Sequence, residues 1–221
     1  MKNHPRMALT KGRLEKETID LLEAAGLNMT PVRMPSRKLI LQVPDYPLDL
    51  ILLKGPDVAT YVEYGVADLG VVGKDVLLED PKPVYEVLDL GFGICRMAVA
   101  GPPEMIDCPK KHLRVSSKYP RIARDYFEGR GQSVEIIHQQ GSVELAPLMG
   151  LADVIVDIVE TGNTLKANGL VVLEEIVPIS ARLVVNKISY KTRRTEMNRL
   201  IDMMEAQLKK AIVERQKGVK P

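Results

Sequence analysis

The chain has 221 residues, of which 45% are hydrophobic and 27% charged, and its formal net charge is +2. This composition is that of an ordinary globular protein of one large domain or two small ones, and it excludes a strongly basic nucleic-acid-binding protein. Because no apolar run approaches the roughly 20 residues of a membrane span and no signal region follows the N-terminus, we expect a cytoplasmic protein that binds no membrane.

The first part of the chain alternates short apolar strands with amphipathic helices. Strands are expected at residues 6–9, 50–53 and 69–72. An apolar stripe from Leu14 to Ala25 predicts a helix that ends at Gly26, and Asp57 is expected to cap a second helix that stops at Gly65. This alternation predicts a parallel-rich α/β sheet.

A second α/β unit is expected from Cys95 onward. Its predicted elements are strands at residues 113–115, 134–137 and 154–157, a helix at 120–127, and a strand at 176–185 that Pro178 interrupts. The last helix, Thr195 to Lys217, carries an apolar stripe that would pack back on the first unit. We therefore expect a discontinuous domain one, residues 1–94 plus 181–221, and a domain two, residues 95–180, around a cleft where strand ends face each other.

The most informative segment is residues 153–169, in which a buried strand leads into a small polar loop and then a short helical turn from Leu165 to Asn168. Unpaired N–H groups at a helix start attract anions, and Gly162 allows the backbone to turn tightly. Thr161 and Thr164 can donate hydroxyl hydrogen bonds to phosphate, whereas Asp157 can accept from sugar hydroxyls. The pattern predicts a site for a ribose 5-phosphate.

A purely structural interpretation of this loop carries comparable weight on physical grounds, because Thr, Gly and Asn commonly cap helices and form turns. The loop has neither the Gly-Lys-Ser/Thr of a P-loop nor the Gly-x-Gly-x-x-Gly of a dinucleotide turn. Asp153 and Asp157 point to the same face of the predicted strand. Of the two, Asp157 is the better candidate for ribose, and Asp153 is open to a structural role.

The run from Glu144 to Leu165 resembles the signature of the ATP phosphoribosyltransferase family. Enzymes of this family catalyse the first step of histidine biosynthesis. The likeness continues in Lys11–Leu14, Asp57–Gly65, Ala67–Asp75, Cys95–Ala100 and Lys118–Ala123, in the same order. The resemblance implies two α/β lobes around a cleft, similar to the type II periplasmic-binding-protein fold. It also implies transfer of the phosphoribosyl group of phosphoribosyl pyrophosphate to N1 of the ATP adenine, with release of pyrophosphate.

Such a reaction needs aligned substrates and neutralised phosphate charge more than a protein acid or base. His4, His112 and His138 lie in no triad or metal pattern, and Cys95 and Cys108 are expected to be buried thiols. Charge stabilisation is assigned to Lys11, Arg13 and Arg33, and phosphoribosyl pyrophosphate binding to Asp157, Glu160, Thr161, Gly162, Asn163 and Thr164. ATP binding is assigned to Arg37, Lys54, Asp68, Gly70, Gly73 and Arg96. For Asp68, Gly70, Gly73 and Arg96, a structural role is an equal alternative.

Mg²⁺ is expected to be coordinated by pyrophosphate oxygens, and we expect no metal site made by the protein alone. The family's long form has a C-terminal regulatory domain, which we do not expect here because only a polar tail follows the last helix. The resemblance is therefore to the short form, which implies a homodimer of catalytic chains and a separate regulatory subunit similar to histidyl-tRNA synthetase.

Two other classes compete with this hypothesis. A solute-binding protein would share the two-lobed fold, but it would normally carry a signal peptide. A different phosphoribosyltransferase would usually show two adjacent acidic residues before its Thr-Gly loop, whereas here Ile158 and Val159 separate Asp157 from Glu160.

Overall fold

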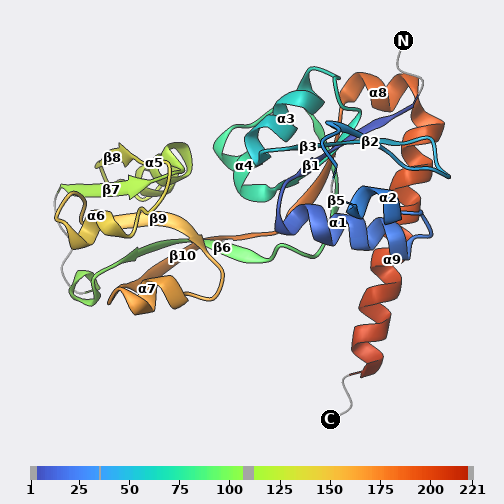
Figure 1. The fold of residues 1–221 in the computed structure, drawn as a ribbon. Coiled ribbons are helices and arrows are strands. Elements are labelled where there is room, and N and C mark those ends of the chain that lie inside the picture. The colour runs from blue at the N-terminus through green and yellow to red at the C-terminus, as the bar shows by residue number, and fades with distance from the viewer. Residues whose placement is uncertain (1–3, 35, 107–111, 219–221) are drawn as a thin grey trace. The chain divides into compact units, whose positions relative to one another are not determined.

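The computed structural model describes residues 4–34, 36–106 and 112–218, and it divides the chain into two compact units (Figure 1). Unit 1 comprises Met1–Leu77, Pro81–Gly93 and Ser180–Pro221, and unit 2 comprises Leu78–Asp80 and Ile94–Ile179. Each unit contains its own mixed sheet and its own hydrophobic core. Among the described residues, no helix combines the length and the apolar character needed to cross a membrane.

The six-stranded sheet of unit 1 has the order β2-β3-β1-β4-β11-β5. Its central strands β3, β1 and β4 are parallel, and β2, β11 and β5 pair antiparallel with their neighbours. The strands are β1 (Arg6–Thr10), β2 (Ile40–Gln42), β3 (Asp49–Leu53), β4 (Leu69–Gly73), β5 (Tyr85–Asp89) and β11 (Ala181–Val185). The helices are α1 (Arg13–Ala24), α2 (Thr30–Arg33), α3 (Gly55–Glu63), α8 (Lys187–Thr192) and α9 (Arg194–Gly218), with α4 (Lys74–Glu79) after β4.

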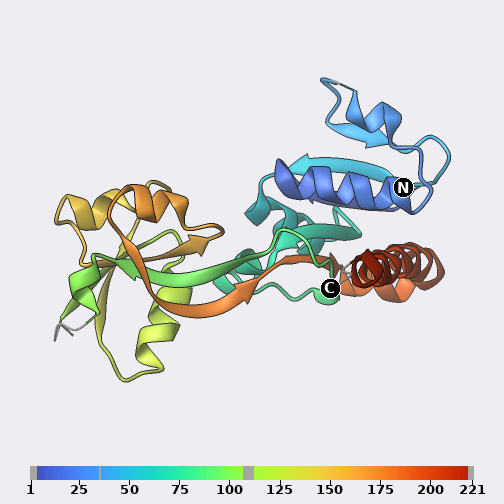
Figure 2. The same ribbon diagram turned by 90° about the horizontal axis from the view of Figure 1, so that it is seen from below.

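Helix α9 packs on unit 1 through the first part of its apolar stripe. Met197, Leu200 and Met204 are fully buried in the core that contains Leu9 of β1 and Leu22 of α1. Helix α9 contacts α1. In Figure 2 α9 is seen nearly end-on and α1 from the side, so the two helices cross. The stripe does not pack along its whole length, because Ile212 is 56% exposed. Burial of the first three turns is therefore what holds this helix to the unit.

Helix α3 covers the other face of this sheet at close range. Its first turn is not capped by Asp57 as expected, because the N-cap position is Lys54 and no side chain makes a capping bond. A Cβ built on Gly70 of β4 would lie 2.8 Å from Cγ atoms of both Val58 and Val62. Gly70 is thus the residue that lets α3 approach the sheet.

We expect Gly70→Ala to lower the free energy of unfolding by about 1–3 kcal/mol, the usual range for overpacking a core. Urea denaturation followed by circular dichroism measures this loss. The second substitution Val62→Ala should recover part of it, since it removes one of the two clashing methyl groups. Equal stability of Gly70→Ala and the parent would contradict the close packing of α3 on β4.

The five-stranded sheet of unit 2 has the order β10-β6-β9-β7-β8. Strands β7, β8 and β9 are parallel, and β6 pairs antiparallel with both β9 and β10. The strands are β6 (Cys95–Gly101), β7 (Leu113–Ser117), β8 (Val134–His138), β9 (Val154–Val159) and β10 (Val171–Ile179). The helices are η1 (Pro103–Met105), α5 (Pro120–Glu128), α6 (Leu145–Leu148) and α7 (Asn163–Ala167).

The predicted strand at residues 176–185 is two strands, and the break is not at Pro178. Pro178 lies within β10, opposite Arg96 of β6. An edge strand tolerates proline because the missing N–H faces no further strand. The chain instead changes sheets at Ser180, between β10 of unit 2 and β11 of unit 1.

Candidate functional site

The loop between β9 and α7 forms one wall of a cavity of about 290 Å³ in unit 2. All six residues assigned from the sequence to phosphoribosyl pyrophosphate line this cavity. The complete lining is Ala98, Ala100, Glu144, Ile155, Asp157, Ile158, Val159, Glu160, Thr161, Gly162, Asn163, Thr164 and Leu165. One short segment of chain, residues 157–165, thus supplies most of the wall.

The pairing of β9 with β6 leaves room for this cavity. Asp157 lies opposite Ala98 in the antiparallel register, and Ile155 lies opposite Ala100. Both alanines are buried in the small apolar cluster that also contains Ile155 and Leu165. Because alternate residues of a strand share a face, Asp157 stands on this same face, above a floor of small side chains. This face of β9 therefore combines the carboxylate of Asp157 with an apolar surface formed by the small side chains.

The loop turns at Gly162, whose φ of +75° is left-handed. A Cβ at this position would meet only Val159 Cγ1, at 3.8 Å, so the backbone conformation, and not crowding within the protein, requires glycine here. Helix α7 begins at Asn163, two residues earlier than the sequence predicted. Thr161, Asn163 and Thr164 are exposed around this turn and available to a ligand.

The two aspartates that flank the apolar part of β9 have different environments. Asp153 is buried, and it accepts hydrogen bonds from the backbone N–H of Arg114 at 2.9 Å and from its guanidinium at 3.2 Å. Asp157 is half-buried, accepts from the N–H of Ile158 at 2.8 Å, and lines the cavity. Asp153 is therefore committed to Arg114, and Asp157 is the carboxylate that lines the cavity.

Glu144 also lines the cavity, although the sequence analysis assigned it no role. It is half-buried and immediately precedes α6. The preceding turn contains Ser142, whose φ of +51° is unusual for a residue with a side chain. The sequence could have identified Glu144 as a candidate, because Glu144 is the first residue of the run that resembles the family signature.

A second cavity, of about 580 Å³, lies in unit 1 and combines cations with apolar surface. Lys11 and Arg37, both assigned from the sequence, line it together. The N–H of Lys11 donates to the carbonyl of Leu53 at 2.8 Å, which holds the loop after β1 beside the end of β3. The other lining residues, which the sequence analysis did not assign, are Arg6, Ser36, Lys38, Leu39, Ile40, Ile51, Leu52, Leu53, Tyr61 and Val66.

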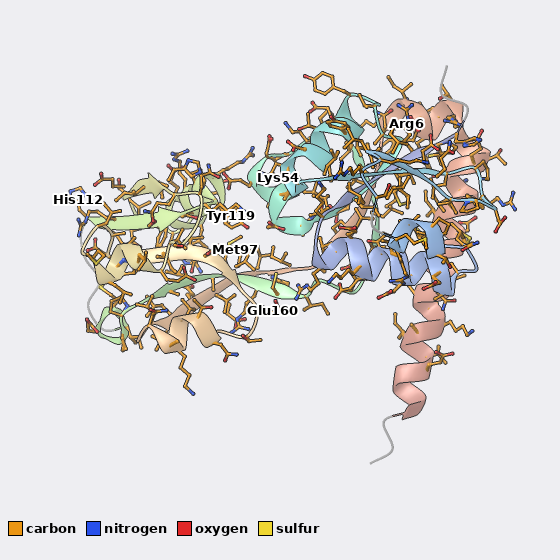
Figure 3. All side chains as sticks on the ribbon, viewed as in Figure 1. Arg6, Lys54, Met97, His112, Tyr119 and Glu160 are labelled. Carbon is orange, nitrogen blue, oxygen red and sulfur yellow. The ribbon has the colours of Figure 1, made fainter. Side chains whose placement is uncertain are left out.

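Three further assigned residues lie near the strand ends of unit 1 but do not line that cavity. Arg13 is the exposed first residue of α1, and Lys54 is exposed at the start of α3. Gly73 ends β4, where a Cβ would collide with the carboxylate of Asp75. Figure 3 labels Lys54, next to α3.

Two of the assigned arginines are engaged in ion pairs. The Arg33 guanidinium lies 2.5 Å from Asp20 and 2.7 Å from Glu23 on α1, and hydrogen bonds to these carboxylates raise its pKa. Arg96 lies 2.8 Å from Glu175 of the neighbouring strand β10. Both geometries favour a structural role, because neighbouring carboxylates already match the positive charge that a phosphate would need.

The assignment of Asp68 and Gly70 to ATP needs correction. Asp68 is 3% exposed, and it accepts from the N–H of Arg6 at 2.8 Å and from the Ser189 hydroxyl at 2.7 Å. Gly70 faces the valines of α3, as described above. The tight turn of a buried βα unit, the alternative left open by the sequence, accounts for both residues.

The histidines and the described cysteine show no catalytic arrangement. His4 lies 3.7 Å from Asp49, His138 contacts Gln140, and His112 is exposed. Cys95 is half-exposed, not buried as expected, and Cys108 lies outside the described residues. Within the part of the chain that the structure describes, no group of three or more His, Cys, Asp or Glu side chains is arranged to hold a metal ion.

Comparison with known sequences supports the resemblance seen in the chain. The family model described as ATP phosphoribosyltransferase matches residues 54–206. An ATP phosphoribosyltransferase of Alkaliphilus metalliredigens (strain QYMF) is 57% identical over 197 residues, which is 89% of this chain and 94% of that protein. One from Bacillus cereus (strain G9842) is 51% identical over 203 residues, covering 92% of this chain and 96% of that protein.

Two solved structures are also similar to this chain. A chain of the ATP phosphoribosyl transferase (HisG:HisZ) complex from Thermotoga maritima superposes with a TM-score of 0.81 at 35% identity, covering 93% of this chain and 98% of that chain. The periplasmic aliphatic sulphonate binding protein SsuA from Escherichia coli superposes with a TM-score of 0.60 at 10% identity, over 97% of this chain and 75% of that one. The second likeness confirms the expected periplasmic-binding-protein type of fold and nothing further.

Proposed function

The chain belongs to the ATP phosphoribosyltransferase family, and we propose from that premise that the cavity beside β9 is its phosphoribosyl pyrophosphate site. The enzyme transfers the phosphoribosyl group to N1 of the ATP adenine and releases pyrophosphate, the first step of histidine biosynthesis. The observation that carries the proposal is that residues 157–164, the core of the family signature, are the residues that wall the cavity.

The chemistry of this site suits binding more than proton transfer. The backbone N–H groups and hydroxyls of Thr161 to Thr164 would hold the 5-phosphate, and Asp157 would accept from the ribose hydroxyls. As the bond from C1 to pyrophosphate breaks, its electron pair leaves with the pyrophosphate, and N1 of adenine forms the new bond to C1. The protein orients both reactants, which lowers the barrier by holding the reacting atoms in line.

We propose that ATP binds to unit 1, with its phosphates at the cations around Lys11 and Arg37. Four cations and the ring of Tyr61 line the cavity there, and no carboxylate is among its described lining residues. Aliphatic side chains such as Ile51 and Leu53 offer an apolar wall. Such a combination fits a ligand that carries both negative charge and a flat apolar base. Lys54 and Gly73 stay predictions for ATP binding, and Arg13 stays a prediction for charge stabilisation.

We propose that Mg²⁺ binds together with the substrates, coordinated by their phosphate oxygens. There it would neutralise charge on the departing pyrophosphate. The donors along the cavity fit this mode, because Asp157, Glu160 and Glu144 offer oxygen ligands of the kind that Mg²⁺ prefers. One of these carboxylates would complete a shell made mainly of phosphate oxygens and water.

We propose that the chain works with a regulatory subunit and as a homodimer, in the cytosol. The support for the subunit is the Thermotoga maritima structure, which is a complex of the similar chain with HisZ. Inhibition by histidine is then expected to appear when a regulatory subunit is added to the purified chain. Saturable binding of histidine to the chain alone, at a site that does not compete with ATP, would contradict this arrangement.

An ultraviolet assay of phosphoribosyl-ATP formation tests the activity directly. The protein, with and without the regulatory subunit, should form product from ATP and phosphoribosyl pyrophosphate. Orotate and hypoxanthine, offered in place of ATP, should give no phosphoribosylated product. Product from either alternative acceptor, or none from ATP with the partner present, would overturn the proposed function.

A further inference from the structure

The cavity beside β9 lacks a cation for the charge of its proposed ligand. Its described lining includes the carboxylates of Glu144, Asp157 and Glu160 but no lysine or arginine. Phosphoribosyl pyrophosphate carries a phosphate at one end of the ribose and a pyrophosphate at the other. Backbone and hydroxyl donors in the β9–α7 loop can hold one anionic group, and the second needs positive charge from a neighbouring element.

The sheet order limits where this second group can lie. The cavity extends from β9 over Ala98 and Ala100 of β6, and α7, which follows the loop, packs against β10 on the far side of β6. On its other side, β9 is parallel to β7, with Ser117 in register with Val156. Figure 1 shows the arrowheads of β7 and β9 at the same edge of the sheet. The residue that follows β7 is Lys118, which is thus level with Asp157.

The backbone around Lys118 is held firmly, whereas its side chain is exposed. The Ser117 hydroxyl donates to the carbonyl of Val156 at 2.6 Å and accepts from the N–H of Tyr119 at 2.8 Å. Tyr119 is buried, and the Lys118 ammonium lies 5.7 Å from the centre of its ring. Figure 3 labels Tyr119 and Glu160 on the same side of unit 2.

Other cations of unit 2 near β9 are less suitable. Arg96 is paired with Glu175, and Arg114, at the opposite end of β7, is paired with Asp153. Lys166 belongs to the last turn of α7, on the 5-phosphate side of the cavity. Among the described residues, no carboxylate pairs with Lys118. Its charge is therefore available where β7 and β9 end.

We propose that Lys118 binds the pyrophosphate group of phosphoribosyl pyrophosphate. The inference rests on the proposed function of the cavity. The proposal places the 5-phosphate in the β9–α7 loop, the ribose hydroxyls at Asp157 and the C1 end of the sugar toward β7. The Lys118 ammonium then stabilises the negative charge that pyrophosphate gains as the C1–O bond breaks. Lys118 would contribute to binding of the leaving group and to the rate of its departure.

Titration calorimetry with two ligands separates this role from a general effect of charge. Lys118→Met should weaken binding of phosphoribosyl pyrophosphate at least about tenfold, or 1.4 kcal/mol, and should change ribose 5-phosphate affinity less than about twofold. Lys118→Arg should restore most of the affinity. The control Arg124→Met removes a positive charge from exposed surface of α5 and should leave both affinities unchanged. In the phosphoribosyl-ATP assay, Lys118→Met should also lower kcat.

Each alternative result has a definite meaning. Unchanged affinity of Lys118→Met for phosphoribosyl pyrophosphate would overturn the proposal. An equal loss for ribose 5-phosphate would also overturn it, because Lys118 would then serve the 5-phosphate. If the parent protein binds neither ligand, the proposed function of the cavity fails, and the role of Lys118 fails with it.

Discussion

Replacement of Lys11 by alanine is expected to lower the rate of phosphoribosyl-ATP formation about a hundredfold, which corresponds to roughly 2.7 kcal/mol of transition-state stabilisation. Lys11 follows β1 and lines the cation-rich cavity with Arg37. We propose that the Lys11 ammonium neutralises phosphate charge on the substrates, together with Arg37 on the same cavity wall. Arg13→Ala is expected to have an effect of similar size. Initial rates at saturating substrate measure both.

Two kinds of control accompany this prediction. Lys16→Ala removes an exposed charge from α1, five residues after Lys11, and should leave the rate unchanged. His112→Ala and His138→Ala should retain most of the activity, because neither ring lies in a catalytic arrangement. A pH–rate profile governed by one histidine with a pKa near its ordinary value of about 6.5 would show that acid–base chemistry has been overlooked.

Gly162→Val is expected to weaken phosphoribosyl pyrophosphate binding at least about tenfold, a loss of 1.4 kcal/mol or more. The reason is the backbone, since a β-branched residue is strongly disfavoured at a φ of +75°. The loop is then expected to change conformation, so that its N–H groups no longer converge on the proposed 5-phosphate position. Titration calorimetry with phosphoribosyl pyrophosphate measures the change in affinity.

Gly131 provides a matched control for this substitution. It lies in unit 2 just after α5, has a φ of +71°, and a Cβ there would meet nothing within 4 Å. Gly131→Val should therefore destabilise the fold by a similar amount without changing ligand affinity. If both variants bind as tightly as the parent, the loop does not hold the phosphate. If both lose affinity equally, the effect of Gly162→Val reflects stability and not the site.

Local patterns in the sequence predicted most elements because local physics decides them. The apolar stripe of α1 and its end near Gly26, the strand after Val154, and the long helix after Thr195 all appear within a few residues of their predicted bounds. Strand β9 runs to Val159, beyond the predicted end at Asp157. The apolar pair Ile158–Val159 continues the strand alternation, although the acidic residue before it suggested a loop.

Strand partners could not be read from the same patterns. The parallel centre of the first sheet was expected, but the antiparallel pairing of β11 with β4 and of β6 with β9 was not. A buried strand shows the same apolar run whichever direction its neighbour takes. Strands β2 and β5 were missed, because β2 has only three residues and β5 has no buried side chain to mark it.

The composition of the candidate site was determined by the sequence itself. Asp157 to Thr164 are consecutive, so a single turn of backbone brings them to one cavity, and the residue types needed for a sugar phosphate are visible in order. The family relationship follows from the same residues, since it depends on their identity and spacing and not on the positions of distant segments.

Only the tertiary structure decided which charged residues are committed elsewhere. The sequence left Asp153 open to a structural role, and the structure shows that Arg114 of the neighbouring strand β7 binds it. The sequence predicted that Arg33 binds phosphate, but in the structure its guanidinium pairs with Asp20 and Glu23 of α1. Packing between segments far apart in the chain determines which ion-pair partner each charged side chain has. The sequence therefore names the candidates, and the fold decides which of them remain available to a ligand.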